Sequence, residues 1–222
     1  MSKHLDRAIS DLRTDLVDQF GIVEQMIGLS VRSLVERRPD LANQVIASDD
    51  QVDANDIRIE EECLKLLALH QPVSADLRWL TTAIKINGDL ERMADLACSI
   101  AERSKSLDFF PLFRVPDDLT PMVRAVIEMV RLSLDSFLDA DSELAQKVIA
   151  SDQEVDRLNV ELIEELQQLM REDPEQVEAA VHCFSASRSL ERIADMASHV
   201  AEETIYLVTG EIIRHREVSA QT

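Results

Sequence analysis

The sequence predicts an all-α protein made of two tandem homologous three-helix bundles, with six long helices in total. Only 4 glycines occur among its 222 residues, too few for the many tight turns that a sheet protein of this size needs. All 6 prolines fall between segments in which apolar residues recur at spacings of three and four, as on one face of a helix. The third observation is a long internal repetition of the sequence, which is described below.

The first three helices are bounded by prolines, because proline is tolerated in the first turn of a helix but interrupts its interior. The first helix ends before Pro39. The second lies between Pro39 and Pro72 and carries a broad apolar stripe that includes Val45, Val52 and Ile59. The third follows Pro72 and ends at a proline-rich stretch. The predicted ranges are 5–37, 40–70 and 73–107.

The last three helices follow the proline-rich stretch. Thr120-Pro121 and Asp173-Pro174 each match an N-cap followed by the first helical residue, so they begin the fourth and sixth helices. The fifth helix lies between these two, with apolar residues at helical spacing. The predicted ranges are 121–140, 142–171 and 174–214.

The two halves of the chain repeat each other. VIASD at 45–49 recurs at 148–152, an offset of 103 residues, and LERMADLA at 90–97 recurs as LERIADMA at 190–197, an offset of 100. The difference falls at the proline-containing turn before the last helix of each half, where an insertion or deletion is tolerated. The predicted units are a first three-helix repeat over 1–107, a linker over 108–120 and a second repeat over 121–222.

Charge and cysteine content exclude several classes of protein. Lys and Arg number 23 and Asp and Glu 43, so the formal net charge is −20, which disfavours binding to nucleic acid or to anionic lipid. The N-terminus is charged throughout, and no stretch has the length of about 18 apolar residues that a membrane helix needs. Cys63, Cys98 and Cys183 lie far apart without a CxxC motif, which argues against disulfides and thiolate zinc sites. We expect a cytoplasmic protein without direct membrane insertion.

Four acidic pairs occupy matching positions in the two repeats. Each pair has i, i+4 spacing, which places both carboxylates on one helix face with Cβ atoms about 5–6 Å apart. Because such charges repel each other, a cation bound through oxygen would stabilise them, and hard cations favour carboxylate ligands. Helix packing would bring four carboxylates together in each repeat. The candidate metal ligands are Asp49, Asp53, Glu91 and Asp95 in the first repeat and Asp152, Asp156, Glu191 and Asp195 in the second.

Two other interpretations of these acids are open at the level of sequence. The first is a metal-free helical scaffold, since many i, i+4 acidic pairs form only a solvated face; recurrence in both repeats favours metal binding instead. The second is a carboxylate-bridged metalloenzyme, but the Glu-x-x-His motif of di-iron proteins is absent from the sequence. A Gly-rich phosphate loop and a Ser-His-Asp pattern are absent as well. We therefore expect a protein that is not an enzyme.

We interpret the hydrophobic residues of the linker and one histidine as structural rather than functional. The linker contains four large hydrophobic residues, Phe109, Phe110, Leu112 and Phe113. We expect them to fill the gap between the repeats rather than to dock a partner, because exposed aromatics are a liability for a soluble chain. His199 shares a helix face with Asp195 and would be able to add a ligand, although a surface histidine is the interpretation that we favour.

A series of motifs spans nearly the whole chain in order. VIASDDQVD, LLALHQPVSADLRW and NGDLERMADLA are followed in the second half by SLERIADMASHVAEETIYLVTGEIIRH. Together they resemble the PhoU family of phosphate-uptake regulators. Ala94 and Ala194 stand where the LERIGD motif of that family has glycine, and alanine preserves close packing. The resemblance implies that the family's acidic E(D)xxxD motifs, associated with multinuclear metal binding, fall on the eight candidate ligands.

The resemblance also implies a function. It implies a cytoplasmic, non-enzymatic negative regulator that restrains phosphate uptake and the phosphate-starvation response. The implied partners are the ATPase subunit of a phosphate transporter and a sensor histidine kinase, between which the protein acts as an adaptor, and a homodimer is expected. The implied cofactors are divalent or trivalent metal ions, such as Fe, Zn, Mn or Mg, in mononuclear or multinuclear centres. A surface of charge −20 would repel free phosphate unless bound metal reversed the local charge, so we expect action through helix-face contacts.

Overall fold

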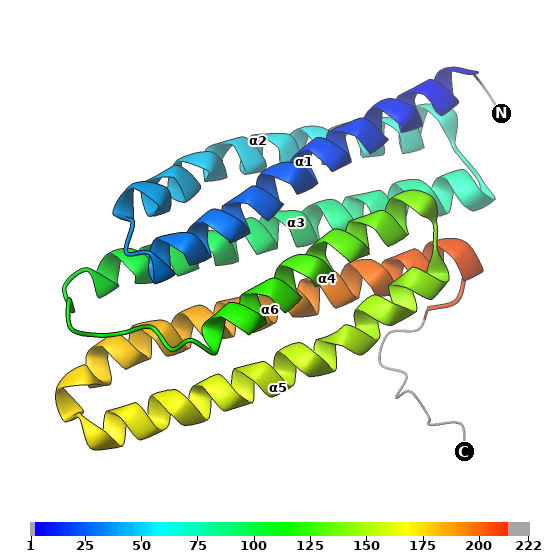
Figure 1. The fold of residues 1–222 in the computed structure, drawn as a ribbon. Helices are drawn as coiled ribbons and strands as arrows, with labels where there is room; N and C mark the ends of the chain where they lie inside the picture. The colour runs from blue at the N-terminus through cyan, green and yellow to red at the C-terminus, as the bar shows by residue number, and fades with distance from the viewer. Residues whose placement is uncertain (1–2, 213–222) are drawn as a thin grey trace, which may run out of the picture.

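The protein folds into six long α-helices joined by short connections, as a computed structural model that describes residues 3–212 shows (Figure 1). Within these described residues no strand occurs, and the all-α prediction is confirmed. The helices are α1 (Lys3–Val35), α2 (Pro39–His70), α3 (Ser74–Leu107), α4 (Leu119–Asp139), α5 (Ser142–Glu172) and α6 (Val177–Thr209), with a short 3₁₀ helix, η1 (Pro174–Gln176), before α6.

Local sequence explains several helix ends. Pro39 stands in the first turn of α2, where its missing N–H costs nothing. Asp141 caps α5 by accepting hydrogen bonds from the backbone N–H groups of Glu143 and Leu144, at 2.9 and 3.0 Å. α6 ends at Gly210, whose φ of 76° lies in the left-handed region that glycine adopts without strain.

Most helix boundaries lie within two residues of the predicted ones, and three of the differences have a local cause. Asp173 does cap a helical turn, but that turn is η1, and α6 begins only after it. α4 begins at Leu119, so Thr120 lies inside its first turn and is not the cap. α6 ends at Thr209 and does not continue to residue 214, because a glycine follows it; residues 213 and 214 of the predicted helix lie outside the described part of the chain.

Two three-helix bundles lie side by side, with α3 and α6 in contact at the centre (Figure 1). α1, α2 and α3 pack on one another, and so do α4, α5 and α6. α3 and α6 run antiparallel: the Nζ of Lys85, in the first half of α3, lies 3.0 Å from an oxygen of Glu203, near the end of α6. The Glu203 side chain is only 4% exposed, so this ion pair ties the two bundles together from within their interface.

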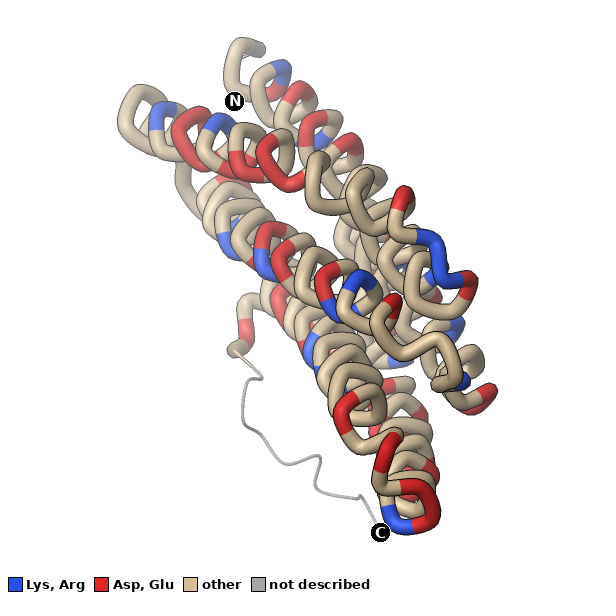
Figure 2. Tube along the Cα trace, turned by 90° about the vertical axis from the view of Figure 1, so that its left-hand side faces the viewer, with Lys and Arg blue, Asp and Glu red and all other residues tan. Residues whose placement is uncertain are grey.

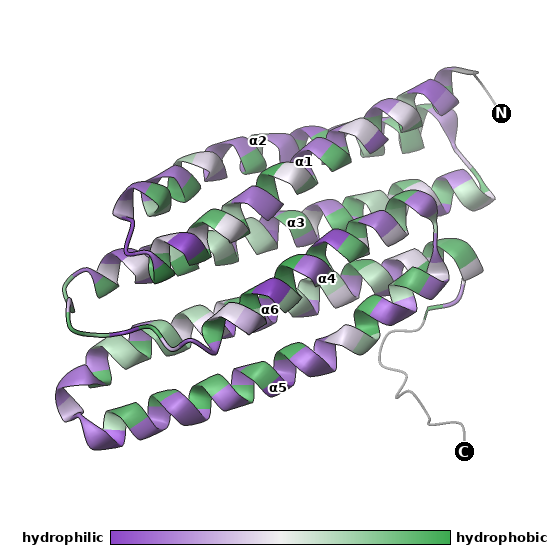
Figure 3. Ribbon diagram, in the orientation of Figure 1, coloured by the Kyte–Doolittle hydropathy of each residue, from purple (hydrophilic) through white to green (hydrophobic). Residues whose placement is uncertain are grey.

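The apolar faces of the helices form one core that runs through both bundles (Figure 3). Its polar details repeat between the two halves. In α1 the hydroxyls of Ser30 and Ser33 donate to carbonyl oxygens three residues earlier, and in α4 those of Ser133 and Ser136 do the same. All four serines are buried, yet each hydroxyl has a partner, so their burial carries little cost. The duplication read from the sequence is therefore also a duplication of structure.

The linker separates its hydrophobic residues into two groups. Phe113 is buried, and Phe110 packs on the core with its ring centroid 6.1 Å from that of His182. Phe109 and Leu112 are each 84% exposed. The expectation of gap filling is right for the first two residues and wrong for the other two. The reason is local: consecutive turns with bonds between residues three apart place 110 and 113 on the inner side and 109 and 112 on the outer side.

Acidic residues are distributed along the helices, with Lys and Arg among them (Figure 2). Many of these charges pair with neighbours on the same helix, as Arg157 does with Glu154 and Glu161 at 2.6 Å each. Such exposed pairs contribute little to stability. Over residues 3–212, none of the helices combines the length and the apolar character needed to cross a bilayer.

Candidate metal sites between paired helices

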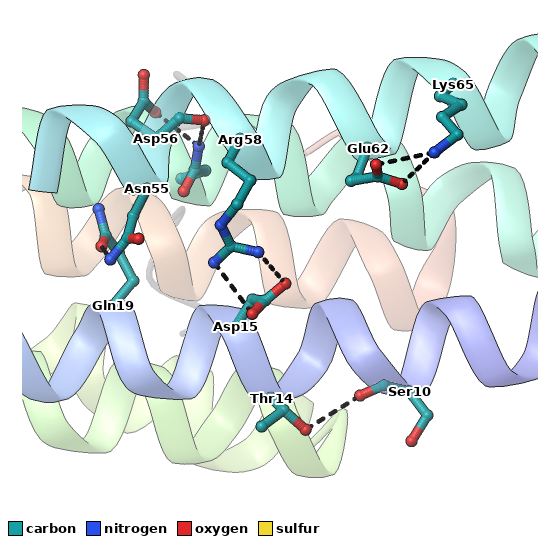
Figure 4. Close-up of polar contacts among 10 residues, drawn as sticks. Ser10, Thr14, Asp15, Gln19, Asn55, Asp56, Arg58, Glu62 and Lys65 are labelled. Carbon is teal, nitrogen blue, oxygen red and sulfur yellow. Dashed lines mark hydrogen bonds and ion pairs between the residues drawn. The ribbon is translucent and has the colours of Figure 1, made fainter. Parts of the chain in front are cut away.

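The first cluster of candidate ligands lies where α2 packs on α3. The Asn87 Nδ2 of α3 donates to the backbone oxygen and to Oδ1 of Asp56 on α2, at 2.9 and 2.6 Å (Figure 4). Three turns further along α3, the Cys98 Sγ lies 3.9 Å from the Val45 carbonyl oxygen. Ala94 lies between these two contacts on the same face of α3 and is fully buried. A small residue there lets α2 approach closely, so the acidic pair of α2 comes beside that of α3.

The carboxylates of this first cluster influence one another's charge. Burial raises the pKa of Asp49, and the neighbouring carboxylates Asp53 and Asp95 raise it further. Burial likewise raises the pKa of Glu91, with contributions from Asp95, Asp56 and Asp53. Asp49 and Glu91 are half-buried, whereas Asp53 and Asp95 are exposed. The acids of the two helices therefore lie close enough to repel each other, with one protected and one accessible carboxylate in each pair.

The second cluster occupies the matching place between α5 and α6. The pKa of Asp152 is raised to about 6, most by burial and then by the charges of Asp195, Asp156 and Glu191. Burial also raises the pKa of Glu191, with Asp195 adding to the shift. All four predicted ligands of the second repeat thus act on one another, and the effect on Asp152 is large.

Basic residues border the second cluster at positions where the first has none. Arg188 donates to Glu191 Oε1 at 3.0 Å, whereas the matching residue of α3 is Gly88. Burial and Asp156 raise the pKa of Asp195, while His199, one turn further along α6, acts in the opposite direction. His199 is exposed, which agrees with its interpretation as a surface histidine.

One oxygen of the second cluster is buried without a hydrogen-bond partner. This oxygen is Glu191 Oε2, a charged acceptor without the interactions it would have in water. The neighbouring acids repel rather than satisfy it. All eight candidate donors are carboxylates, the ligands that hard cations prefer. The residues therefore fit a cation bound through oxygen.

The side chains as they stand do not form a complete coordination shell. Among residues 3–212, no three His, Cys, Asp or Glu side chains are placed so that they would hold one ion. The eight candidates are nevertheless gathered into two sets of four, one at the α2–α3 contact and one at the α5–α6 contact. Exposed side chains change rotamer within nanoseconds, so uptake of an ion would require only that the carboxylates turn toward it.

Sequence reasoning missed three residues that shape these clusters. Comparison of the repeats discounts Asp56, because Asn159 stands at its matching position, yet burial, Glu60 and Asp53 raise the pKa of Asp56. The other two are Asn87, which fixes α2 on α3, and Arg188, which pairs with an acid of the second cluster. Asn87 stands one turn before Glu91, the first candidate ligand of α3, and that i, i+4 spacing is the signal that the sequence offers.

The chain matches known proteins over nearly its full length. Residues 16–104 and 119–204 each match the family described as the PhoU domain. The phosphate-specific transport system accessory protein PhoU homolog of Deinococcus radiodurans is 36% identical over 204 residues, which cover 90% of this chain and 96% of that relative. The protein of the same description from Aquifex aeolicus is 37% identical over 214 residues, covering 96% and 97% of the two chains.

A solved structure agrees with these matches. The crystal structure of PhoU from Pseudomonas aeruginosa superimposes with a TM-score of 0.89 at 35% sequence identity, and the match covers 93% of this chain and 99% of that one. Two matched segments, one in each three-helix repeat, account for the duplication found in the sequence. By fold, by repeat and by sequence identity, this chain belongs to the PhoU family.

Proposed function

We propose that this protein is a metal-binding negative regulator of phosphate uptake and of the phosphate-starvation response. The observation that carries the proposal is the likeness, over almost the whole chain, to proteins described as accessory to a phosphate-specific transport system. A regulatory rather than an enzymatic role agrees with the acidic clusters, which offer cation ligands and no activated nucleophile among the residues described above.

The acidic clusters give the proposal its mechanism. Asp49, Glu91 and their two partners would hold metal in the first repeat, and the matching four acids would hold it in the second. A bound cation supplies positive charge where the free protein is strongly negative. The half-buried acids would anchor the ion, and the exposed acids Asp53 and Asp95 would close over it or release it. The metal-loaded surface would then present a different charge to a partner.

The proposed partners are the ATPase subunit of the phosphate transporter and a sensor histidine kinase, between which the protein acts as a cytoplasmic adaptor, as a homodimer. Support comes from the descriptions of the relatives and from the long exposed helix faces of the fold. Binding of each purified partner to this protein, measured by calorimetry at low and high phosphate, tests the adaptor role. Failure to bind either partner under both conditions would contradict it, and sedimentation velocity tests the dimer.

Metal analysis of purified protein tests the clusters directly. The protein is stripped with chelator, reloaded separately with Mg, Mn, Zn or Fe, and its metal content is measured. Asp152→Ala with Asp195→Ala, and separately Asp49→Ala with Asp95→Ala, should each remove about half of the bound metal. Glu154→Ala is the control, because it removes an exposed acid of α5 that already pairs with an arginine. Equal metal content in all variants would contradict the site assignment.

A metal-free helical scaffold is the second candidate function. The observation in its favour is that, in the described part of the chain, no three potential ligands are placed to hold an ion. This alternative predicts that chelation leaves partner binding unchanged and that the alanine variants bind partners as the wild type does. The metal-binding proposal predicts that both treatments weaken partner binding.

A further inference from the structure

The second repeat contains a groove that the proposed metal sites do not use. It lies between residues 114–117 at the end of the linker and Glu165, Gln168, Leu169 and Glu172 of α5, with a volume of about 530 Å³. We call it the linker groove. The linker groove faces away from the α5–α6 contact that holds the second acidic cluster, since its residues pair α5 with the linker rather than with α6.

The matching groove of the first repeat is smaller, and two of its carboxylates form ion pairs. It lies between α1 and α2 and has a volume of about 310 Å³. There Arg58 binds the Asp15 carboxylate through two nitrogens, at 2.6 and 3.0 Å, and the Lys65 Nζ lies 2.9 Å from Glu62 (Figure 4). Two cations therefore pair with two of the three carboxylates that line the first groove, the third being Asp11.

Both of these cations are missing from the second repeat. At the offset of 103 residues, Glu161 stands in place of Arg58 and Gln168 in place of Lys65, whereas the acids Asp118 and Glu165 are kept. The duplicated groove has therefore lost the two cations that pair with carboxylates in the first copy, while Arg114, which replaces Asp11, supplies a cation at another position.

The linker groove is consequently an uncompensated acidic surface. Partial burial raises the pKa of Glu165, and Asp118 and Asp117 raise it further. Of the described residues that line the groove, Arg114 is the one basic side chain, against three carboxylates that include Glu172. Over residues 3–212, no basic side chain forms an ion pair with Glu165 or Asp117.

An exposed apolar pair precedes residues 114–117 of the groove on the same linker. Phe109 and Leu112 are each 84% exposed, more than any other large hydrophobic side chain of residues 3–212. The loop that carries them is fixed in place, because the Arg37 guanidinium donates to the carbonyl oxygens of Leu107 and Phe113 on either side of the pair. Side chains held in position before binding lose less entropy when a partner covers them.

We propose that Phe109, Leu112 and the linker groove form a docking surface for a segment of a partner protein that carries leucine-sized or phenylalanine-sized side chains next to lysine or arginine. The apolar side chains of the partner would cover Phe109 and Leu112. Its basic side chain would enter the groove and balance Glu165, as Lys65 balances Glu62 in the first repeat. Apolar anchors beside a complementary charge are the usual composition of a strong contact.

Charge excludes a second copy of this chain as the preferred occupant. A symmetric dimer through this surface would place the same patch of both copies at one interface. Each copy carries a net charge of −20 and would bring its own acidic groove, so like charges would meet. A basic segment faces no such repulsion.

A peptide titration tests the surface without the transporter, the kinase or phosphate, so its outcome is separate from that of the proposed function. The probe is a synthetic amphipathic peptide of leucine and lysine, and a leucine–glutamate peptide of equal length is the control. Calorimetry with the full chain should detect binding of the lysine peptide alone. Gln168→Lys, which restores the cation of the first groove, should weaken binding by about tenfold, and Phe109→Ser with Leu112→Ser should weaken it similarly.

Matched variants separate docking from general charge attraction. Gln25→Lys adds the same charge at an exposed position of α1 and should change binding much less than Gln168→Lys. Equal effects of the two lysine variants would overturn the proposal, as would unchanged binding after loss of Phe109 and Leu112, or equal binding of both peptides. All of these side chains are exposed, so thermal unfolding should be unaltered. A dimer that dissociates in the Phe109 and Leu112 variant would also overturn the proposal, because it would assign the surface to a second copy.

Discussion

The two repeats share their helices and their eight candidate ligands but differ in what surrounds them. In the first repeat the buried Gln19 amide donates to the Val52 carbonyl oxygen at 3.0 Å and accepts from Asn55 at 3.0 Å (Figure 4). In the second, Met122 and Leu158 stand at the matching positions of Gln19 and Asn55 and pack within the core. One fold therefore tolerates a polar or an apolar contact between the same two helices.

The outer grooves of the two repeats differ in their ion pairs, and basic side chains border the second acidic cluster at positions where the first has none. The first repeat closes its outer groove with ion pairs, whereas the second leaves the matching groove acidic. The second acidic cluster is the more strongly perturbed, since the pKa of Asp152 is raised to about 6. Both repeats have thus kept the helices and the core, while the carboxylates of the second repeat's outer groove have fewer ion pairs.

The largest difference in stability should come from one pair of matched core residues. Phe137 and Leu34 are each 1% exposed at equivalent positions, but Phe137 also stacks on Trp79 of the first repeat with ring centroids 6.0 Å apart. Phe137→Ala should therefore lower the free energy of unfolding by about 4 kcal/mol and Leu34→Ala by about 3 kcal/mol. Urea unfolding measures both. If Leu34→Ala lowered the free energy of unfolding more than Phe137→Ala, the contact of Phe137 with Trp79 would contribute nothing to stability.

Exchange of the polar contact between α1 and α2 is the next test. Gln19→Ala should destabilise the protein by about 2 kcal/mol, because it leaves a small cavity and removes the partner of Asn55. The double variant Gln19→Met with Asn55→Leu copies the second repeat and should lie within about 1 kcal/mol of the wild type. If the double variant were as unstable as Gln19→Ala, the two repeats would not be interchangeable at this contact.

Acidification should affect the second cluster more than the first. The folded state raises the pKa of Asp152 to about 6, above the value of about 4 in the unfolded chain, so the native state binds more protons between these two pH values. The stability of metal-free protein should therefore rise as the pH falls through this window. Asp152→Asn should stabilise the protein at pH 7 by about 1 kcal/mol, after allowance for solvent screening. The variant should also lack the rise in stability that the wild type shows as the pH falls from about 6 to about 4.

Asp49 is the matched control for that measurement. Its pKa is raised by the same causes, so Asp49→Asn should change stability in the same direction but by less. Thermal unfolding of both variants at pH 5 and pH 7 distinguishes the two clusters. Equal effects at both positions would contradict the stronger perturbation of the second cluster.

The smallest effect should come from the ion pair that closes the first groove. Arg58 and Asp15 have side chains that are 48% and 29% exposed, so Arg58→Gln should cost only about 0.5 kcal/mol. The difference in free energy of unfolding between this variant and the wild type should be smaller at high salt. Chemical unfolding at two ionic strengths measures that difference. A loss of several kcal/mol would mean that the first groove depends on its cation for folding as well as for charge balance.

The sequence predicts the helices, because proline position and apolar spacing are local signals, and the duplication indicates which acids occupy matching positions; the assignment of those acids as a metal site stays a prediction. The predicted helix boundaries are less accurate. An Asp-Pro pair is favourable at the start of a 3₁₀ turn and of an α-helix alike, so the pair at Asp173 does not indicate which of the two follows. The pairing of Asn87 with Asp56 and the outward direction of Phe109 depend on how helices and turns pack in space. That information is not carried by residue spacing alone.

The ion pairs at the interface of α3 and α6 also bear on how the chain is made. The first repeat is synthesised before α6 exists, so the face of α3 that later contacts α6 is open to water for some time. That face carries Lys85 and the Asp89–Arg92 pair, and Glu203 reaches Lys85 only when the second repeat is complete. A nascent chain that exposes charges there is less prone to aggregate than one that exposes only Leu and Ile. The same residues that join the finished bundles would thus keep the unfinished half of the protein soluble.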